Sequence, residues 1–214
     1  DNYVPVILDD SRKPQYVKQI NWFAQHNPQV KVIRRHNHVG FKGGNIDHFL
    51  SRYHNYDYFV LLDSDELIPH NFISKALHYF AKFPQLGILQ CNHRSKRNWN
   101  HFMSTFSRSS FSFWSIYNTV RMIYGFASMY GHGTMISRQC YEAIGGFPKI
   151  VSEDVGFSLE ARFKGYRTMF CNSIVCDEEF PVDYLAFKKR QNKWTAGNWE
   201  FIKHYTIPIL RSHM

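Results

Sequence analysis

The sequence has few cysteines and no pattern that would make them structural. Only four occur among 214 residues, and no two have the Cys-x-x-Cys spacing of a zinc site or a redox pair. Each stands in apolar surroundings, which argues against a disulfide framework and favours reduced thiols in a cytosolic setting. The four are Cys91, Cys140, Cys171 and Cys176.

Long hydrophobic runs are also absent. No stretch of about 18 uncharged apolar residues occurs, so no segment is predicted to span a bilayer. No signal peptide, low-complexity tract or internal repeat is recognised. With 44% hydrophobic and 17% aromatic residues, the chain has enough apolar material for a core, and one domain over residues 1–214 is expected.

Acidic residues are outnumbered by basic ones. The chain has 26 lysines and arginines against 17 aspartates and glutamates, which gives a formal charge of +9. This balance favours an anionic partner, which could be a nucleotide, a nucleic acid or an acidic lipid surface. The 12 histidines are scattered, and His36-Asn37-His38 is interpreted as part of a loop rather than as a pair of metal ligands.

The chain does contain an alternation of strand and helix patterns. This order predicts an α/β fold with a mostly parallel sheet flanked by helices. In open sheets of this kind, ligands bind beyond the carboxyl ends of the strands. Strands are expected at residues 4–8, 30–34, 58–62, 86–90 and 134–137, and helices at residues 14–26, 46–53 and 72–83.

Two acidic clusters follow predicted strands. Asp9-Asp10-Ser11 follows the first strand, and Asp63-Ser64-Asp65 follows the strand at residues 58–62. Because side chains alternate along a strand, Asp63 and Asp65 are expected to point the same way and could share one divalent cation. The competing interpretation is an ordinary polar exit from the strand, since an Asp-x-Asp pattern alone is common.

Three later segments carry further candidate residues. Ser152-Glu153-Asp154 is expected to open a helix with Ser152 as its N-cap, and capping alone would explain the triplet. Residues 190–194 place two cations and an indole together, which in most proteins is a solvated basic face. Aromatic side chains at helical spacing in residues 100–129 predict an amphipathic helix that packs on the core or lies in a membrane interface.

Taken in order, these motifs resemble one family. The chain resembles the catalytic domain of a family 2 glycosyltransferase with the GT-A (Rossmann-like) fold. Its pattern is similar to that of the processive, membrane-embedded synthases of cellulose, hyaluronan and related β-glucans. The matching segments are Asp9-Asp10-Ser11, Lys42-Gly43-Gly44-Asn45, Asp63-Ser64-Asp65, Gly131-His132-Gly133-Thr134, Ser152-Glu153-Asp154 and Arg190-Gln191-Asn192-Lys193-Trp194.

The resemblance implies a nucleotide site near the start of the chain. In such enzymes the first aspartate pair recognises the uridine, which here means Asp9 or Asp10. Lys42 and Asn45 would contact the nucleotide from a loop whose glycines allow the backbone to approach closely. A helix-capping turn is the competing interpretation of this loop.

The resemblance also implies a cation site for the diphosphate. Asp63 and Asp65 would hold Mg²⁺ or Mn²⁺ on the diphosphate oxygens, since both ions prefer hard oxygen ligands. Lys193 and Arg190 would add positive charge from the opposite side of the diphosphate. The implied reaction is inverting transfer of a sugar from a UDP-sugar, UDP-glucose foremost, to a growing β-linked polysaccharide.

The acceptor side is implied in the same way. Asp154 matches the catalytic aspartate of the family and would deprotonate the acceptor hydroxyl. Trp194 would form a platform for a sugar ring, unless it is an ordinary core tryptophan. The other residues expected on the acceptor side of the pocket are His132, Gly133, Thr134 and Glu153.

Two departures from the family pattern stand out. The last motif usually reads Gln-Gln/Arg-x-Arg-Trp, whereas Arg190 and Lys193 occupy its first and fourth places here, and lysine lacks the bidentate fork of arginine. In addition, the usual first strand of the fold is lacking. We therefore expect either a fragment of a larger membrane protein at the cytoplasmic face of the cell membrane, held there by transmembrane segments outside this sequence or by residues 100–129, or an incomplete nucleotide half that makes the isolated piece a poor enzyme.

Two other functions suit parts of the sequence. The positive charge and interleaved aromatic residues would fit a basic nucleic-acid-binding module, but the acidic clusters would repel a phosphate backbone, so no nucleic acid is expected as a partner. Paired aspartates also serve metal-dependent nucleotidyltransferases. Trp194 favours the sugar transferase, because an indole has an evident use for a sugar acceptor.

Overall fold

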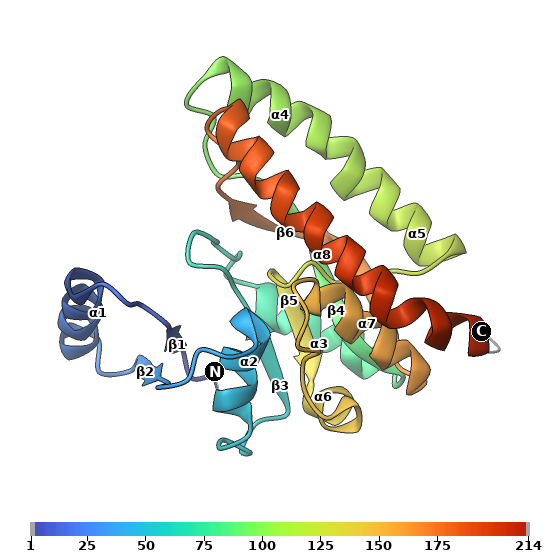
Figure 1. Ribbon diagram of the computed structural model, residues 1–214, viewed down its shortest axis with the longest axis horizontal. Helices are drawn as coiled ribbons and strands as arrows, with labels where there is room; N and C mark the ends of the chain where they lie inside the picture. Colours follow the sequence, from blue (N-terminus) through green and yellow to red (C-terminus); the bar gives the residue numbers. More distant parts are fainter. Residues whose placement is uncertain (1–2, 213–214) are drawn as a thin grey trace. The chain divides into compact units, whose positions relative to one another are not determined.

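The computed structural model describes residues 3–212 and divides the chain into two compact units (Figure 1). The first comprises the residues up to Asn55 together with Phe147–Lys149, and the second comprises Tyr56–Gly146 together with the residues from Ile150 onward. Within the described residues, no helix combines the length and the apolar character needed to cross a membrane.

The first unit is a β-α-β arrangement followed by a second helix. Strands β1 (Val6–Asp9) and β2 (Lys31–Arg34) pair in parallel, and helix α1 (Pro14–His26) connects them. Pro14 lies in the first turn of α1, where its missing N–H is not needed. Helix α2 (Phe41–Leu50) starts earlier than the expected residue 46, after a turn in which Gly40 has a φ of 80°.

The second unit is built on a four-stranded sheet with the order β3-β5-β4-β6. Strands β3 (Tyr58–Leu61) and β4 (Leu86–Ser95) both pair antiparallel with β5 (Thr134–Ser137), whereas β6 (Arg167–Glu178) pairs parallel with β4. This sheet is therefore mixed rather than mostly parallel, because the chain enters β5 from the edge at which β3 ends. β6 was not predicted from the sequence.

The strand directions bring several loops to one edge of this sheet. Leu61, the last residue of β3, pairs with Thr134, the first residue of β5. Strands β4 and β6 also end at this edge, where Ser95 lies opposite Glu178. The loop after β3, the loop before β5 and the end of β6 therefore lie close to one another.

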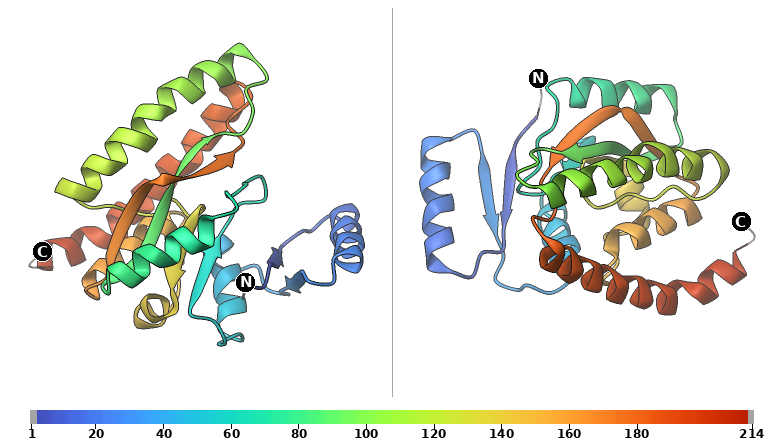
Figure 2. Two further views of the ribbon diagram at one scale, coloured as in Figure 1. Left: turned by 180° about the vertical axis from the view of Figure 1, so that it is seen from behind. Right: turned by 90° about the horizontal axis from the view of Figure 1, so that it is seen from above.

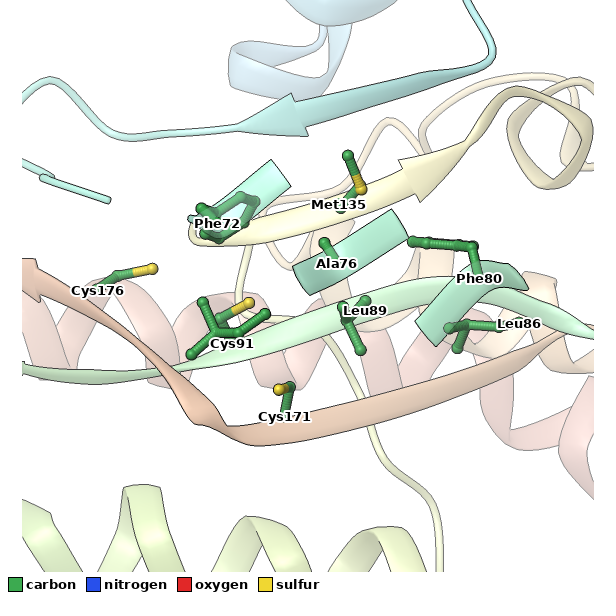
Figure 3. Close-up of a cluster of buried hydrophobic side chains, with 10 residues drawn as sticks. Phe72, Ala76, Phe80, Leu86, Leu89, Cys91, Met135, Cys171 and Cys176 are labelled. Atoms are coloured by element: carbon green, nitrogen blue, oxygen red, sulfur yellow. The ribbon is translucent and has the colours of Figure 1, made fainter. Parts of the chain in front are cut away.

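Helix α3 (Phe72–Lys82) packs on this sheet and builds the core of the second unit (Figure 3). Its apolar residues Phe72, Ala76 and Phe80 recur every four positions, which places them on one face of the helix. The sheet contributes side chains from β4, β5 and β6. The buried cluster consists of Phe72, Ala76, Phe80, Leu86, Leu89, Cys91, Met135, Cys171, Ile174 and Cys176.

All four cysteines are buried and free in the described chain. Burial raises the pKa of the Cys140 thiol to about 12. The pKa of Cys91 is also raised, first by its hydrogen bond with Cys176 and then by burial. Both thiols are therefore protonated and behave as small apolar side chains of the core.

The segment expected to form one amphipathic helix is helical in three parts. Helix α4 (His101–Phe111) continues into a π-helical turn, η1 (Ser112–Tyr117), and then into α5 (Asn118–Tyr124). Met103, Trp114 and Asn118 are its buried residues. The large hydrophobic residues that it exposes are Phe111, Phe113, Ile116, Tyr117, Val120, Ile123 and Tyr124.

The longest helix, α8 (Tyr184–Arg211), was not predicted (Figures 1 and 2), and its start contacts α4, where the ring centroids of Phe187 and Phe106 lie 5.5 Å apart. Asp183 caps its start by accepting a hydrogen bond from the N–H of Ala186 at 2.8 Å. Farther along, Tyr205 packs with Leu159 of helix α7 (Glu153–Phe163). The short helix α6 (Arg138–Ile144) follows β5 directly.

We expect the α3 face to dominate the stability of the second unit. Replacing Phe72 by alanine should lower the free energy of unfolding by about 3–5 kcal/mol, because the phenyl ring is fully buried and would leave a cavity. Leu77→Ala is the matched control, since Leu77 lies on the same helix but is 37% exposed. Urea unfolding followed by fluorescence measures both, and equal effects would contradict this assignment of the core.

Candidate functional site

The residues after β3 form a turn rather than a continued strand. The strand ends at Leu61, and the N–H of Glu66 donates to the carbonyl oxygen of Asp63 at 3.2 Å. Side-chain alternation therefore does not set the directions of Asp63 and Asp65, contrary to the expectation. Asp63 is exposed, whereas Asp65 is partly buried and its Oδ2 accepts from the N–H of Glu179 at 3.3 Å.

Glu66 is the buried member of this turn, with a side chain that is 0% exposed. Its Oε2 accepts hydrogen bonds from the N–H of Asp63 at 3.2 Å and from the N–H of Gly133 at 3.0 Å. One carboxylate oxygen thus joins the turn after β3 to the loop before β5. No role was predicted for Glu66, because a further acidic residue in a polar run gives no signal of burial.

Two histidines and a second glutamate surround the Glu66 carboxylate. Nδ1 of His93 and Nδ1 of His132 each lie 3.6 Å from Oε1 of Glu66. Nε2 of His132 lies 3.7 Å from Oε2 of Glu178, at the end of β6. His132 is therefore placed between two carboxylates, one facing each of its ring nitrogens.

Burial and mutual charge set the protonation of this group. Burial lowers the pKa of His93 to about 2, with a further contribution from His132, so His93 is neutral. Burial also acts to lower the pKa of His132, but the nearby carboxylates of Glu66 and Glu178 outweigh it and raise the pKa. Burial raises the pKa of Glu178 to about 7, although His132 and Arg190 oppose the shift.

The π-helical turn η1 contributes an aromatic wall. Trp114 is buried there and stacks on His93, with ring centroids 4.4 Å apart and an interplanar angle of 29°. Tyr130 meets the same indole edge-on at 5.1 Å. A π-helical turn carries an extra residue and so rotates the helix face, and such turns are frequent at functional sites.

Asp154 lies against the loop before β5. Gly131 has a φ of 78°, and a β-carbon at that position would lie 3.6 Å from Cβ and 3.7 Å from Oδ2 of Asp154. Asp154 is the second residue of α7, after Glu153, and its Oδ1 accepts from the N–H of Val155 at 2.8 Å. The helix starts where expected and Ser152 occupies its N-cap position, but the Ser152 side chain makes no capping hydrogen bond.

The basic motif lies on the first half of α8. The Arg190 guanidinium carbon lies 4.7 Å from the ring centroid of Trp194 and 5.5 Å from that of Phe106. Burial lowers the pKa of Arg190, while the nearby charges of Glu178 and Asp65 oppose that shift. Trp194 is 48% exposed, so it is not a core residue, but Arg190 stacks against its ring. Lys193 is exposed.

Close packing attaches α8 to the segment that carries Asp154. A β-carbon at Gly197 would lie 2.5 Å from the Oγ of Ser152, so only glycine allows this approach. Glu200 Oε2 accepts from the N–H of Val151 at 2.8 Å. The start of α7 and the basic motif of α8 are thereby held in one arrangement.

Two predicted acceptor residues have roles inside the protein. Gly133 is buried, and its carbonyl oxygen accepts from the N–H of Cys91 at 2.9 Å. Thr134 is 0% exposed, and its Oγ1 donates to Gln90 Oε1 at 2.7 Å. The Thr134 hydroxyl is thus enclosed beside Gln90, and Gly133 serves the loop itself, whereas their predicted acceptor contacts stay predictions. His132 is 15% exposed and faces Glu66 and Glu178.

The predicted uridine residues lie in the first unit and are held by arginines. Oδ1 of Asp9 accepts from the N–H of Ser11 at 2.9 Å, and its other oxygen accepts from Arg34. Burial acts to raise the pKa of Asp9, but the hydrogen bonds from Ser11 and Arg34 lower it overall. Asp10 accepts hydrogen bonds from Nε of Arg35 at 2.9 and 3.2 Å and from its Nη2 at 2.6 Å.

Arg35 also shapes the glycine-containing loop. Its guanidinium donates to the carbonyl oxygens of Val39 at 2.7 Å and Phe41 at 2.8 Å. A β-carbon at Gly44 would lie 2.2 Å from the Val39 oxygen, so this glycine is required by packing inside the protein. The segment expected as a loop is therefore helical, since Lys42, Gly44 and Asn45 all lie on α2, and the buried Oδ1 of Asn45 has no hydrogen-bond partner among the described residues.

The turn after β3 has the donor set of a hard divalent cation. Asp63 and Asp65 supply carboxylate oxygens two positions apart on a turn, and Asp63 is exposed to incoming ligands. Mg²⁺ and Mn²⁺ take oxygen ligands and are commonly bound by one or two carboxylates together with substrate phosphates. The residues present therefore fit such an ion bound together with a diphosphate.

Comparison with known proteins identifies the matching family and fold. A family model described as Glycosyl transferase family group 2 matches residues 58–213, which is most of the chain. Glucomannan 4-beta-mannosyltransferase 1 of Cyamopsis tetragonoloba is 22% identical over 219 residues, and the match covers 98% of this chain and 42% of that relative. The chain thus spans less than half the length of this relative.

Solved structures show the same fold. Mannosyltransferase PcManGT from Pyrobaculum calidifontis, in complex with GDP-Man and Mn²⁺, is similar with a TM-score of 0.66 and 19% identity, over 92% of this chain and 54% of that one. TarS of S. aureus is similar with a TM-score of 0.62 and 15% identity, over 98% of this chain and 34% of that one. The fold is that of GT-A glycosyltransferases, as expected from the sequence.

We expect the buried Glu178 to make stability depend on pH. The folded protein keeps this proton up to about pH 7, whereas an unfolded glutamate loses it near its ordinary value of 4.5. The stability contributed by the protonated group is therefore lost as pH rises from about 4.5 to 7. The free energy of unfolding of Glu178→Gln, relative to that of the wild type, should therefore rise by up to roughly 3 kcal/mol between pH 5 and pH 8.

Urea unfolding at several pH values measures this difference. The exposed Glu142→Gln variant is the matched control, since Glu142 makes only a surface ion pair with Arg138 and should give a difference that hardly changes with pH. A Glu178→Gln difference that is the same at pH 5 and pH 8 would contradict the raised pKa.

Proposed function

The chain belongs to glycosyl transferase family group 2, and from this membership and the site we propose that it transfers a hexose from a nucleoside diphosphate sugar to a glycan hydroxyl, with inversion and with a divalent cation. One observation supports this most directly. The Asp63–Asp65 turn and the Gly131–Gly133 loop, against which Asp154 lies, are joined at one edge of the sheet by the Glu66 carboxylate. A cation site and a basic carboxylate are the two groups that such a transfer needs.

The cation side stabilises the leaving group. Departure of the sugar leaves negative charge on a nucleoside diphosphate, and fixed positive charge at that point lowers the barrier. Asp63 and Asp65 would hold Mg²⁺ or Mn²⁺ there, and the bound ion would act as a Lewis acid toward the diphosphate oxygens. Arg190 and Lys193 on α8 would contribute further positive charge, and one such donor is typically worth roughly 3 kcal/mol of barrier.

The acceptor side supplies the base. Asp154 lies beside Gly131, whose lack of a side chain leaves the carboxylate accessible from the loop. In the proposed reaction Asp154 takes the proton of the acceptor hydroxyl as the oxygen attacks the anomeric carbon. Direct attack inverts the anomeric centre, so an α-linked donor gives a β-linked product without a glycosyl-enzyme intermediate. Trp194 would offer the acceptor the part of its ring that Arg190 does not cover.

Two donors are supported by different observations. The sequence resemblance to β-glucan synthases favours UDP-glucose. The curated relative is a glucomannan mannosyltransferase, and a neighbouring structure holds GDP-Man, which favours GDP-mannose. Calorimetric titration of UDP and GDP with and without Mn²⁺ would choose between them. Family membership leaves no support for the nucleotidyltransferase or nucleic-acid-binding alternatives.

We further propose that the exposed apolar surface of η1 and α5 faces the lipid of a membrane, at the cytoplasmic side. The support is the exposure of Ile116, Ile123 and Tyr124, at 55%, 59% and 84%. Arg121 lies on the same segment and could meet anionic lipid head groups. Co-sedimentation with anionic and with neutral vesicles would test this orientation, and absence from both pellets would contradict it.

Asp65→Ala should remove most of the metal-dependent nucleotide binding. We expect Mn²⁺-dependent affinity for the preferred nucleoside diphosphate to fall by at least about 10-fold, because a carboxylate ligand of the ion is lost. Calorimetry measures this, with Glu142→Ala as an exposed acidic control. Unchanged affinity in Asp65→Ala would exclude Asp65 as a ligand.

Asp154→Asn should abolish transfer and spare nucleotide binding. The amide cannot accept the proton, so transfer to manno- or gluco-oligosaccharides should fall by about 10²- to 10⁴-fold. The affinity for the nucleoside diphosphate should stay within about 3-fold of the wild type, since Asp154 touches only the acceptor. Retained turnover would remove Asp154 as the base.

A further inference from the structure

Several buried polar groups at this edge have no part in the proposed chemistry. Oε1 of Glu66, Nδ1 of His93 and Nδ1 of His132 are buried and make no hydrogen bond within 3.5 Å among the described residues. They nevertheless face one another at 3.6 Å. A buried carboxylate oxygen that accepts no hydrogen bond is unfavourable, so this convergence on Oε1 requires an explanation.

The Gln90 side chain determines which ring nitrogen of His93 carries the proton. Its Oε1 accepts from the N–H of Tyr130 and from the Oγ1 of Thr134, both at 2.7 Å. Its amide nitrogen therefore points the other way, toward the carbonyl oxygen of His132 at 3.0 Å and Nε2 of His93 at 3.2 Å. Because that nitrogen donates, Nε2 of the neutral His93 ring is the acceptor, and Nδ1 carries the proton.

This tautomer argues against a second metal ion among these residues. Histidine and glutamate donors do converge here, as in many transition-metal sites. Binding an ion through Nδ1 of His93 would move the proton to Nε2, directly against the amide nitrogen of Gln90. With the proton on Nδ1, His93 instead points its N–H at Oε1 of Glu66 and, 3.8 Å away, at Oε1 of Glu178.

The loop before β5 is packed directly on these groups. Gly133 has a φ of 56°, and a β-carbon there would lie 2.4 Å from Nε2 of His93 and 2.6 Å from Oε1 of Glu66. Gly133 also donates its N–H to Oε2 of Glu66. The path of residues 131–133, and with it the surroundings of Asp154, therefore depends on the position of one carboxylate.

We propose that Glu66 is a positioning residue of the transferase, which holds the cation-binding turn and the acceptor-side loop in register through its two backbone hydrogen bonds. His93 and His132 hold the Glu66 carboxylate in place. The inference rests on the proposed function, since it assigns the turn to the donor and the loop to the acceptor. Loss of Glu66 should therefore reduce sugar transfer to the acceptor more than it reduces nucleotide binding at the turn or hydrolysis of the nucleotide sugar.

Glu66→Gln and Glu66→Ala test this, with Glu142→Gln as the control for loss of an exposed carboxylate. In Glu66→Gln the carbonyl oxygen can still accept one or both backbone N–H groups, but the amide nitrogen cannot accept from His93. Transfer to oligosaccharide should fall by about 10²-fold, because small displacements of reacting groups cost that much. Hydrolysis of the same nucleotide sugar by water, which does not need the acceptor loop, should change by less than about 5-fold.

Two measurements separate this role from a structural one. Mn²⁺-dependent binding of GDP or UDP should stay within about 3-fold of the wild type in Glu66→Gln, because Asp63 and Asp65 remain. In ¹⁵N-correlated spectra, the amide protons of Asp63 and Gly133 should both move upfield in the variant, which needs no activity to observe. A variant that only unfolds more easily would lose transfer, hydrolysis and nucleotide binding together.

The outcomes distinguish the inference from the function on which it rests. Wild-type protein without metal-dependent nucleotide binding would remove the proposed function. Active wild type with a Glu66→Gln variant that keeps its transfer-to-hydrolysis ratio, or leaves the two amide protons unshifted, would overturn the role of Glu66 alone. If Glu66→Ala does not fold, Glu66→Gln, which is nearly isosteric, still decides the question.

Discussion

The site depends on the antiparallel pairing of β5 with β3. Because Leu61 lies opposite Thr134, the residues that leave β3 and the residues that enter β5 share one edge of the sheet. A parallel β5 would place its entering loop at the other end, away from Asp63. The buried Glu66 carboxylate then fixes the separation of these two segments by binding a backbone N–H of each.

The second constraint is the attachment of α8 to the start of α7. Gly197 allows the helix to approach Ser152, and Glu200 binds the backbone of Val151. Since Asp154 follows within two residues of Ser152, the helix that carries Arg190 and Trp194 is held to the segment that carries the proposed base. Lys193, in the fourth place of the basic motif, is exposed. Its ammonium group adds positive charge but does not orient a bound phosphate as the two-pronged guanidinium of arginine would.

Much of the fold could be predicted from local patterns. Helix α1 lies at the predicted residues 14–26, because Pro14 marks its start, and β3 and β5 lie where short apolar runs end in polar residues. Helix α8 was missed because most of its large apolar residues are exposed and do not gather on one buried face, so it has no clear amphipathic period. β6 was missed because its residues alternate irregularly between buried and exposed positions.

The site was only partly predictable for a related reason. Motif residues such as Asp65 and Asp154 are recognisable because they match motifs of the family that the sequence resembles. The residues that position them, Glu66, Gln90 and His93, owe their roles to burial and to contacts between distant strands, which no local pattern reveals. The same holds for Thr134, whose hydroxyl suggested a ligand contact but is enclosed beside Gln90.

Paramagnetic relaxation by bound Mn²⁺, in the presence of GDP or UDP, tests the central claim most directly. If the turn after β3 binds the ion beside the acceptor loop, amide signals of residues 63–66, 131–133 and 154 should broaden most strongly. Signals of α6, which follows the opposite end of β5, should broaden least. Strongest broadening in α6, or an effect at residues 63–66 that leaves residues 131–133 and 154 unchanged, would contradict a single shared site.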